Sequence, residues 1–221
     1  MANEKKAGTL ILSQIRMFNE AKIHFEDVVE KAILDVIDKM LEMFSKDIGW
    51  NGEFELAGEN SNCWLAPAEW HIAGSEEKAA HKAYFDMETN DGDNDYWTAL
   101  FCQQGSTGGE AGFMFTVNPK FINIKDWKAH MSKIDSTLIS KLKKLDFQPL
   151  ENGNFFLPVY LEVDQLVKVW ENYDETEDIK LTGECLSPLN VALQKLNESW
   201  VTFDTMVGSL ATTTSSKLGK S

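Results

Sequence analysis

Arginine is almost absent from this 221-residue sequence: Arg16 stands alone, and every other basic side chain is a lysine. Readers of nucleic-acid sequence and phosphate-binding enzymes rely on bidentate guanidinium contacts, so this lack argues against both classes. Basic residues are also outnumbered, 21 against 35 acidic ones, which gives a formal net charge of −14 at pH 7. Such a surface repels DNA, RNA and anionic lipid, and we expect neither a nucleic-acid nor a membrane partner.

Cysteine is also scarce. The chain has three, Cys63, Cys102 and Cys185, with no CxxC pair and no metal-ligand spacing to a histidine. This odd, scattered set predicts no disulfide framework and is typical of a reducing compartment. No apolar stretch is long enough to span a membrane, and the first eight residues lack the apolar core of a signal peptide. We therefore predict a cytoplasmic protein.

Motifs for nucleophilic or phosphate chemistry are missing as well. The sequence has no GxSxG motif, and its four histidines are scattered. The glycine-rich segment 105–112 lacks the lysine of a phosphate-binding loop and leads into a predicted strand, so it predicts a flexible hairpin connection. On this interpretation the chain is not an enzyme, and we expect no catalytic residues and no cofactor.

One long helical pattern covers residues 9–47. Apolar side chains recur there at steps of three and four residues with charges between them, and Gly49 supplies a stop signal. Because no proline or glycine interrupts the pattern, we expect one long helix or two with a bend. The apolar stripe is wide, which favours packing on a sheet or on a partner over a narrow coiled-coil seam.

Residues 50–117 change to the period of β-strands. Five short runs rich in aromatic and other β-favouring residues lie at 53–56, 63–72, 82–89, 95–103 and 111–117. Because they follow one another without helices between them, they predict an antiparallel meander of about five strands. Pro67 in the second run predicts an edge strand or a bulge there.

The rest of the chain predicts a helix, a strand and two further helices packed on the sheet. They cover 126–145, 154–163 with a break at Pro158, 164–173 and 187–206. Residues 1–8 predict a mobile leader and 211–221 a disordered tail, because neither segment has an apolar period. We therefore expect an α+β protein with a single domain over 9–210, in which the helix 9–47 can be semi-independent.

Five carboxylates gather in and around the turn after the third predicted strand: Asp86, Glu88, Asp91, Asp93 and Asp95. Asp86 and Glu88 share one strand face, and a turn at 92–93 would place them opposite Ala99 and Trp97. If buried, the pair could hold Mg²⁺ or Ca²⁺, with the aspartates of the turn as further ligands. This predicts a metal-dependent, nuclease-like hydrolase with Asp86 and Glu88 as catalytic carboxylates. The alternative is a solvated sheet face that ends in a plain hairpin turn.

A second acidic cluster contrasts with a lysine-rich segment at 120–144. The cluster consists of Glu171, Asp174, Glu175, Glu177 and Asp178. Because the charge is polarised, we expect a non-enzymatic protein that binds another protein or a second copy of itself, as an inhibitor or regulator. The second acidic cluster is the candidate contact. The acidity also fits a nucleic-acid mimic, whose carboxylates imitate phosphates and occupy a DNA-binding protein.

Overall fold

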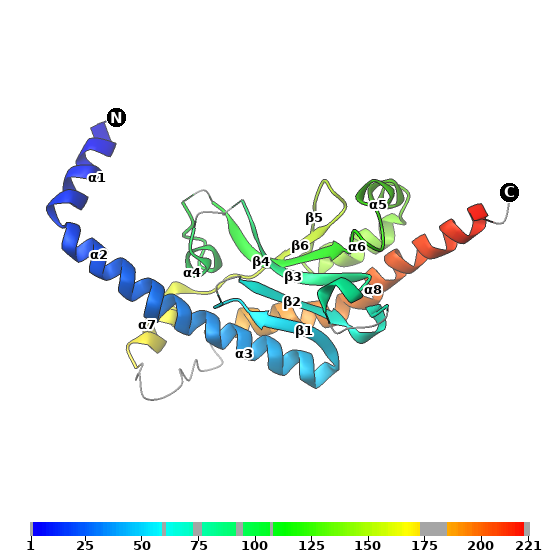
Figure 1. Ribbon diagram of the computed structural model, residues 1–221, viewed down its shortest axis with the longest axis horizontal. Helices are drawn as coiled ribbons and strands as arrows, with labels where there is room; N and C mark the ends of the chain where they lie inside the picture. Colours follow the sequence, from blue (N-terminus) through cyan, green and yellow to red (C-terminus); the bar gives the residue numbers. More distant parts are fainter. Residues whose placement is uncertain are drawn as a thin grey trace.

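The computed structural model describes residues 2–58, 61–72, 77–91, 95–106, 108–172 and 185–218 (Figure 1). They form an α+β fold around one antiparallel sheet of six strands in the order β1-β2-β3-β4-β6-β5. The strands are β1 (Trp50–Glu55), β2 (Asn62–Pro67), β3 (Ala83–Asn90), β4 (Glu110–Val117), β5 (Gln148–Pro149) and β6 (Phe155–Pro158). The predicted α+β class with an antiparallel sheet is confirmed.

A long helical run precedes the sheet. It consists of α1 (Ala2–Ser13), α2 (Ile15–His24), a π-helix η1 (Phe25–Glu30) and α3 (Lys31–Ile48). The predicted helix 9–47 is therefore divided at Gln14 and changes its winding in η1. Residues 2–8, where the sequence predicts a leader, are helical. Gly49 ends α3 with a φ of 71°, a left-handed conformation that glycine adopts without steric cost.

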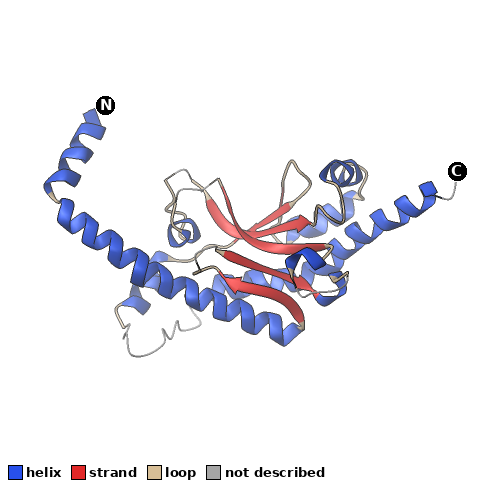
Figure 2. Cartoon of the chain, viewed as in Figure 1, coloured by secondary structure: helices blue, strands red, loops and turns tan. Residues whose placement is uncertain are grey.

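The remaining helices follow β3. They are α4 (Trp97–Phe101), α5 (Ile124–Met131), α6 (Ser136–Lys144), α7 (Val163–Trp170) and α8 (Ser187–Leu218). Two 3₁₀ turns, η2 (Ala68–Trp70) and η3 (Lys78–Ala80), lie between β2 and β3. Helix α8 continues beyond its predicted end at residue 206 and through residues 211–218 of the predicted tail. Figure 2 shows how the long helices run beside the sheet.

Aromatic rings join α3 and α8 to one face of the sheet. Phe203 of α8 stacks on Phe115 of β4 with ring centroids 4.0 Å apart, and its ring also meets Phe85 of β3. Phe44 of α3 contacts Trp50 of β1, and Trp50 stacks on the same Phe85. Both helices therefore cover the same apolar face, where the core lies.

The prediction of a strand at 95–103 is wrong, because this segment contains α4. Trp97, Leu100 and Phe101 recur at steps of three and one, so they share one helical face, and Leu100 and Phe101 are fully buried. The strand prediction used the alternation of Trp97, Ala99 and Phe101. Two of these residues, Trp97 and Phe101, also belong to the helical face. A short apolar run of this kind fits both periods.

Two other boundaries differ from the prediction. The predicted helix 126–145 is two helices, α5 and α6, because the Asp135 carboxylate accepts a hydrogen bond from the Thr137 amide and begins a new helix there. Pro67 marks no edge: β2 pairs with β1 on one side and β3 on the other, and the proline closes the strand. The unpredicted strand β5 is two residues long.

Glycine substitutions test the close packing of the sheet. A Cβ atom at Gly112 of β4 would lie 2.2 Å from the Leu157 carbonyl oxygen of the neighbouring strand β6. We expect Gly112→Ala to lower the unfolding free energy by about 3 kcal/mol or more, because backbone must move. Gly208→Ala is the control: its Cβ would meet nothing within 4 Å, and in α8 it should stabilise by about 0.5–1 kcal/mol. Urea denaturation measures both, and equal effects would contradict the contact.

Candidate functional site

The carboxylates of the predicted hydrolase site lie on β3 but face other neighbours than expected. Asp86 pairs in register with Trp64 and Met114, and Glu88 lies opposite Gly112. The expected partners at 97 and 99 belong to α4 and are absent from the described pairing of β3. Asp86 is buried, whereas Glu88 is exposed to solvent.

Asp86 forms an ion pair with Lys78 from the turn η3. Burial raises the pKa of this carboxyl to about 6, and the charge of Glu88 adds to the rise, while Lys78 opposes it. The Lys78 ammonium also lies 4.6 Å from the ring centroid of Tyr84. Burial, then the nearby carboxylates, raises the pKa of Tyr84 to about 12. This arrangement ties η3 to the sheet.

The other predicted ligands do not join Asp86. The Asp95 carboxylate accepts hydrogen bonds from the Ser106 amide at 2.9 Å and the Ser106 hydroxyl at 2.7 Å, so it holds the loop before β4. Asp91 is exposed at the end of β3, and Asp93 lies outside the described residues. Within the described ranges, no three His, Cys, Asp or Glu side chains are grouped in a way that could hold a metal ion.

The second predicted acidic cluster is described only at its start. Glu171 is exposed directly after α7. Its other members, Asp174, Glu175, Glu177 and Asp178, lie outside the described residues. As a partner contact, this cluster stays a prediction.

Two histidines that are ten residues apart in the sequence meet in the fold. His71 and His81 form an isolated β-bridge, and their ring centroids are 5.2 Å apart. His81 is buried, with Nδ1 3.1 Å from the Glu77 carbonyl oxygen and Nε2 3.0 Å from the Asn51 amide nitrogen. Burial lowers the pKa of His81. Donation from Nδ1 and acceptance at Nε2 suit a neutral ring that joins β1 to the loop before β3.

A serine–histidine pair lies in a surface hollow of about 680 Å³ between α5, α6 and α8. The Ser209 hydroxyl lies 3.1 Å from His130 Nε2, but both groups also bond the Met206 carbonyl oxygen, at 2.8 Å and 2.9 Å. To donate to a carbonyl, Nε2 must carry the proton, so it cannot accept one from the serine. The pair therefore ties α5 to α8 and is not an activated nucleophile.

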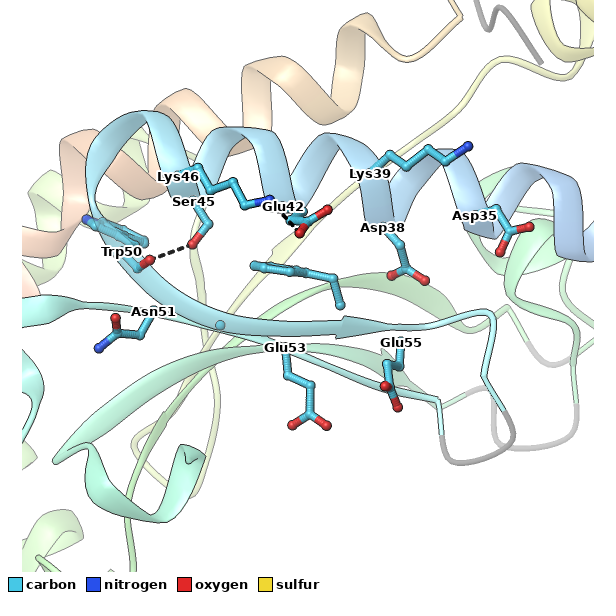
Figure 3. Close-up of a pocket in the computed structure, with 12 residues that line it drawn as sticks. Asp35, Asp38, Lys39, Glu42, Ser45, Lys46, Trp50, Asn51, Glu53 and Glu55 are labelled. Atoms are coloured by element: carbon cyan, nitrogen blue, oxygen red, sulfur yellow. Dashed lines mark hydrogen bonds and ion pairs between the residues drawn. The ribbon is translucent and has the colours of Figure 1, made fainter. Parts of the chain in front are cut away.

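A groove between α3 and β1 gathers more charge than these clusters (Figure 3). Its volume is about 680 Å³. Gly49 reverses the chain between the two elements, and the Ser45 hydroxyl donates to the Trp50 carbonyl oxygen at 2.8 Å, which holds the start of β1 against α3. The helix and the strand therefore lie side by side as the two walls.

Five carboxylates and two ammonium groups line this groove. They are Asp35, Asp38 and Glu42 of α3, Glu53 and Glu55 of β1, and Lys39 and Lys46 of α3. Lys46 pairs with Glu42 at 2.6 Å along the helix. The formal charge of the lining is thus −3. The sequence did not predict this acidic groove. The helical spacing of Asp35, Asp38 and Glu42 indicates an acidic helix face in the sequence. Nothing in the sequence indicates that β1 lies beside this face.

Asp38 is the one buried carboxylate among the residues that line the groove. Its carboxylate accepts hydrogen bonds from the amides of Leu56 at 3.0 Å and Ala57 at 3.1 Å, which should favour the charged form. The pKa of Asp38 is nevertheless raised, mainly by burial, with the nearby charges of Asp35 and Glu55 adding to the rise. A cation in the groove would relieve this repulsion.

The groove follows the free edge of the sheet. All six residues Trp50–Glu55 line it, although alternate residues of a strand point to opposite faces. The strand's edge, rather than one face, therefore forms the wall. β1 is the first strand in the sheet order and pairs with β2 alone among the described strands. Helix α3 bonds its backbone at the start of the strand, where Ser45 donates to Trp50, and just after its end, where Asp38 accepts from Leu56.

Comparisons with protein-family models, with curated proteins and with solved structures find no match for this chain. In the part of the chain that the structure describes, no helix is both long and apolar enough to cross a membrane. The geometry of the groove is therefore the basis for a functional proposal.

We expect Asp86→Asn to change how stability depends on pH. Because the pKa of Asp86 is raised from 3.8 to about 6, the folded protein holds this proton more tightly than the unfolded chain does. The stability that results is complete below about pH 4 and is lost as pH rises through 6. The variant lacks this loss, so its unfolding free energy relative to wild type should rise by about 3 kcal/mol between pH 4 and pH 7.

Urea denaturation followed by tryptophan fluorescence at each pH measures this difference. Glu69→Gln, which removes an exposed acid of η2 that does not contribute to the pKa of Asp86, is the control and should stay within about 0.5 kcal/mol of wild type. A difference between Asp86→Asn and wild type that is the same at all pH values would contradict the raised pKa.

Proposed function

We propose that this protein acts by binding a lysine- or arginine-rich, extended segment of another protein in the groove between α3 and β1. The observation that carries the proposal is an edge of β1 that pairs with none of the described strands and lies beside five carboxylates. An added strand would satisfy the backbone groups of this edge, and its cationic side chains would meet the acidic lining. An inhibitor or regulator of a basic protein would act in this way.

The positions of the carboxylates suit an extended ligand. Glu53 and Glu55 are two residues apart on β1 and share one strand face, whereas Asp35, Asp38 and Glu42 approach from α3 (Figure 3). Successive side chains of an added strand would point alternately toward these two groups of acids, so a peptide with lysine at every second position would direct all of its lysines to one group. Charge would thus select basic segments, and backbone hydrogen bonds would supply affinity that depends little on sequence.

The two other functions predicted from the sequence receive less support. The hydrolase needs carboxylates that converge on a cation, and Asp86 is instead paired with Lys78. A nucleic-acid mimic needs an uninterrupted acidic array, and Lys39 and Lys46 interrupt the acids of α3. A DNA-binding protein with a basic extended tail would still be a suitable partner for the groove.

Fluorescence anisotropy with a labelled peptide of alternating lysine and valine tests the proposal. We expect saturable binding that weakens as salt rises, because the contacts are electrostatic. Glu53→Gln/Glu55→Gln should raise Kd about tenfold, the effect of losing two ion pairs with the peptide at the protein surface, while a glutamine at 53 can still accept the hydrogen bond that the Trp64 indole donates to Glu53. The matched control is Glu162→Gln/Glu171→Gln, which removes the same charge at exposed positions outside the groove and should leave Kd within about twofold.

A second pair of peptides tests the strand edge itself. Methylation of alternate backbone nitrogens removes the donors that an added strand needs, so the methylated peptide should bind much more weakly at equal charge. A peptide of alternating glutamate and valine should not bind. The proposal fails if the methylated peptide binds as well as its parent, or if the groove variant and its control behave alike.

A further inference from the structure

The helical run before the sheet changes its winding where it begins to be buried. It is α-helical in α2, π-helical in η1 and α-helical again in α3. His24 and Lys31, on either side of η1, both have right-handed helical backbone, so the run continues through η1. Helix α2 has no buried residue, whereas Glu30 at the end of η1 is buried. π-helical turns inside α-helices are rare and often lie at functional sites.

A short segment at the start of α4 contacts η1 at both of its ends. The Tyr96 hydroxyl donates to Glu26 Oε1 at 2.7 Å, and the Tyr96 ring packs edge-on against Phe25 with centroids 4.8 Å apart. The Thr98 amide donates to the Glu30 carboxylate and lies 3.3 Å from each of its oxygens. Residues 96–98 therefore contact both the first and the last residue of η1.

The winding of η1 determines whether both contacts can form at once. Phe25 and Glu30 are five residues apart, and in an α-helix such residues are offset by about 140° and point to different sides. Bonding from i to i+5 instead brings residues five apart onto successive turns of one side. Tyr96 and Thr98 can then reach both of them. The contacts with residues 96–98 therefore favour π winding over the α winding on either side.

One group opposes this contact. Among the buried side-chain nitrogen and oxygen atoms of the described residues, the hydroxyl oxygen of Thr98 alone has no hydrogen-bond partner. Burial of a hydroxyl without a partner is unfavourable. Opening the contact would expose this hydroxyl to water and let η1 return to α winding.

We propose that residues 96–98 are a clamp that holds η1 in π winding and thereby sets the orientation of α2. When the clamp opens, η1 rewinds as an α-helix, and α2 turns about the axis of the run by about 100°, the rotation of one residue. Helix α3 stays in place, because Ile33, Ile37 and Leu41 are buried in the core. Figure 1 shows α2 extending beyond the sheet, where it can turn.

Double electron–electron resonance on the full chain tests the clamp. Spin labels on unnatural amino acids at position 201 of α8 and at either 17 or 19 of α2 leave the native cysteines unchanged. Positions 17 and 19 lie on different sides of α2, so a turn changes at least one of the two distances. Tyr96→Ala should raise the ratio of turned to clamped molecules about tenfold, because one hydrogen bond and one ring contact are lost.

Two further variants control this result. Phe121→Ala removes a ring that is 42% exposed, against 40% for Tyr96, at a position outside α4 and η1, and should keep the wild-type distances. Thr98→Val removes the unsatisfied hydroxyl and keeps the amide, so when added to Tyr96→Ala it should lower the ratio about fivefold. The clamp is wrong if Tyr96→Ala and Phe121→Ala give the same distances, or if Thr98→Val raises the ratio. Thermal unfolding verifies that the variants fold.

Deletion of Asp27 distinguishes rewinding from simple bending. Asp27 is an exposed residue of η1, and a π-helical turn contains one residue more than the α-helical turn in its place. With one residue removed, an α-helix keeps the flanking helices in their present orientation. Tyr96→Ala should therefore leave both distances unchanged in the deletion variant. A turn that persists there would contradict rewinding.

The clamp and the groove are separate sites. The groove is lined by residues of α3 and β1, which the turn of α2 leaves in place. Tyr96→Ala should therefore bind the lysine–valine peptide as wild type does. A failure of the clamp thus leaves the proposed function testable on its own.

Discussion

Phe203 stacks face to face on Phe115 at the centre of the sheet, with ring centroids 4.0 Å apart. Phe85, Phe147 and Phe155 approach the edges of the same ring at 5.2–5.5 Å, so α8 is fixed across β3, β4 and β6 by one side chain. With the centre of this face occupied, α3 covers it near β1, and the same helical run continues past the end of the sheet. The groove between α3 and β1 follows from this placement of the two helices.

The sequence predicts those elements whose apolar period is unambiguous. The helix before Gly49 and the strands β1 to β4 lie close to where the pattern places them, because each has enough residues to distinguish a period of two from one of 3.6. The run at 95–103 was predicted wrongly, since Trp97 and Phe101 fit both periods. The break before α6 depends on one hydrogen bond from Asp135, which periodicity does not detect.

The candidate site is harder to predict than the fold because it is made of two elements. The acids of α3 are visible in the sequence as helical spacing, but an acidic helix face is usually only solvated. What distinguishes Asp38 is that its carboxylate accepts hydrogen bonds from the amides of Leu56 and Ala57, directly after β1. That proximity depends on the turn at Gly49 and on the Ser45 hydrogen bond to β1. Conversely, the cluster of acids around Asp86 predicted a metal site from the sequence, but in the fold Asp86 forms an ion pair with Lys78.

Each of the three acidic side chains that are buried among the described residues has a partner. Asp86 is compensated by Lys78, Asp38 by two backbone amides, and Glu30 by the amide of Thr98. A buried charge without such partners would cost several kcal/mol, so the fold accepts acids inside only when each is paired. Among the residues whose burial is described, the other acidic side chains are exposed or half-buried. Four of them, together with Asp38, line the groove between α3 and β1. Aromatic packing thus holds the fold together, and under the proposed function the charge gathered at the groove would select the partner.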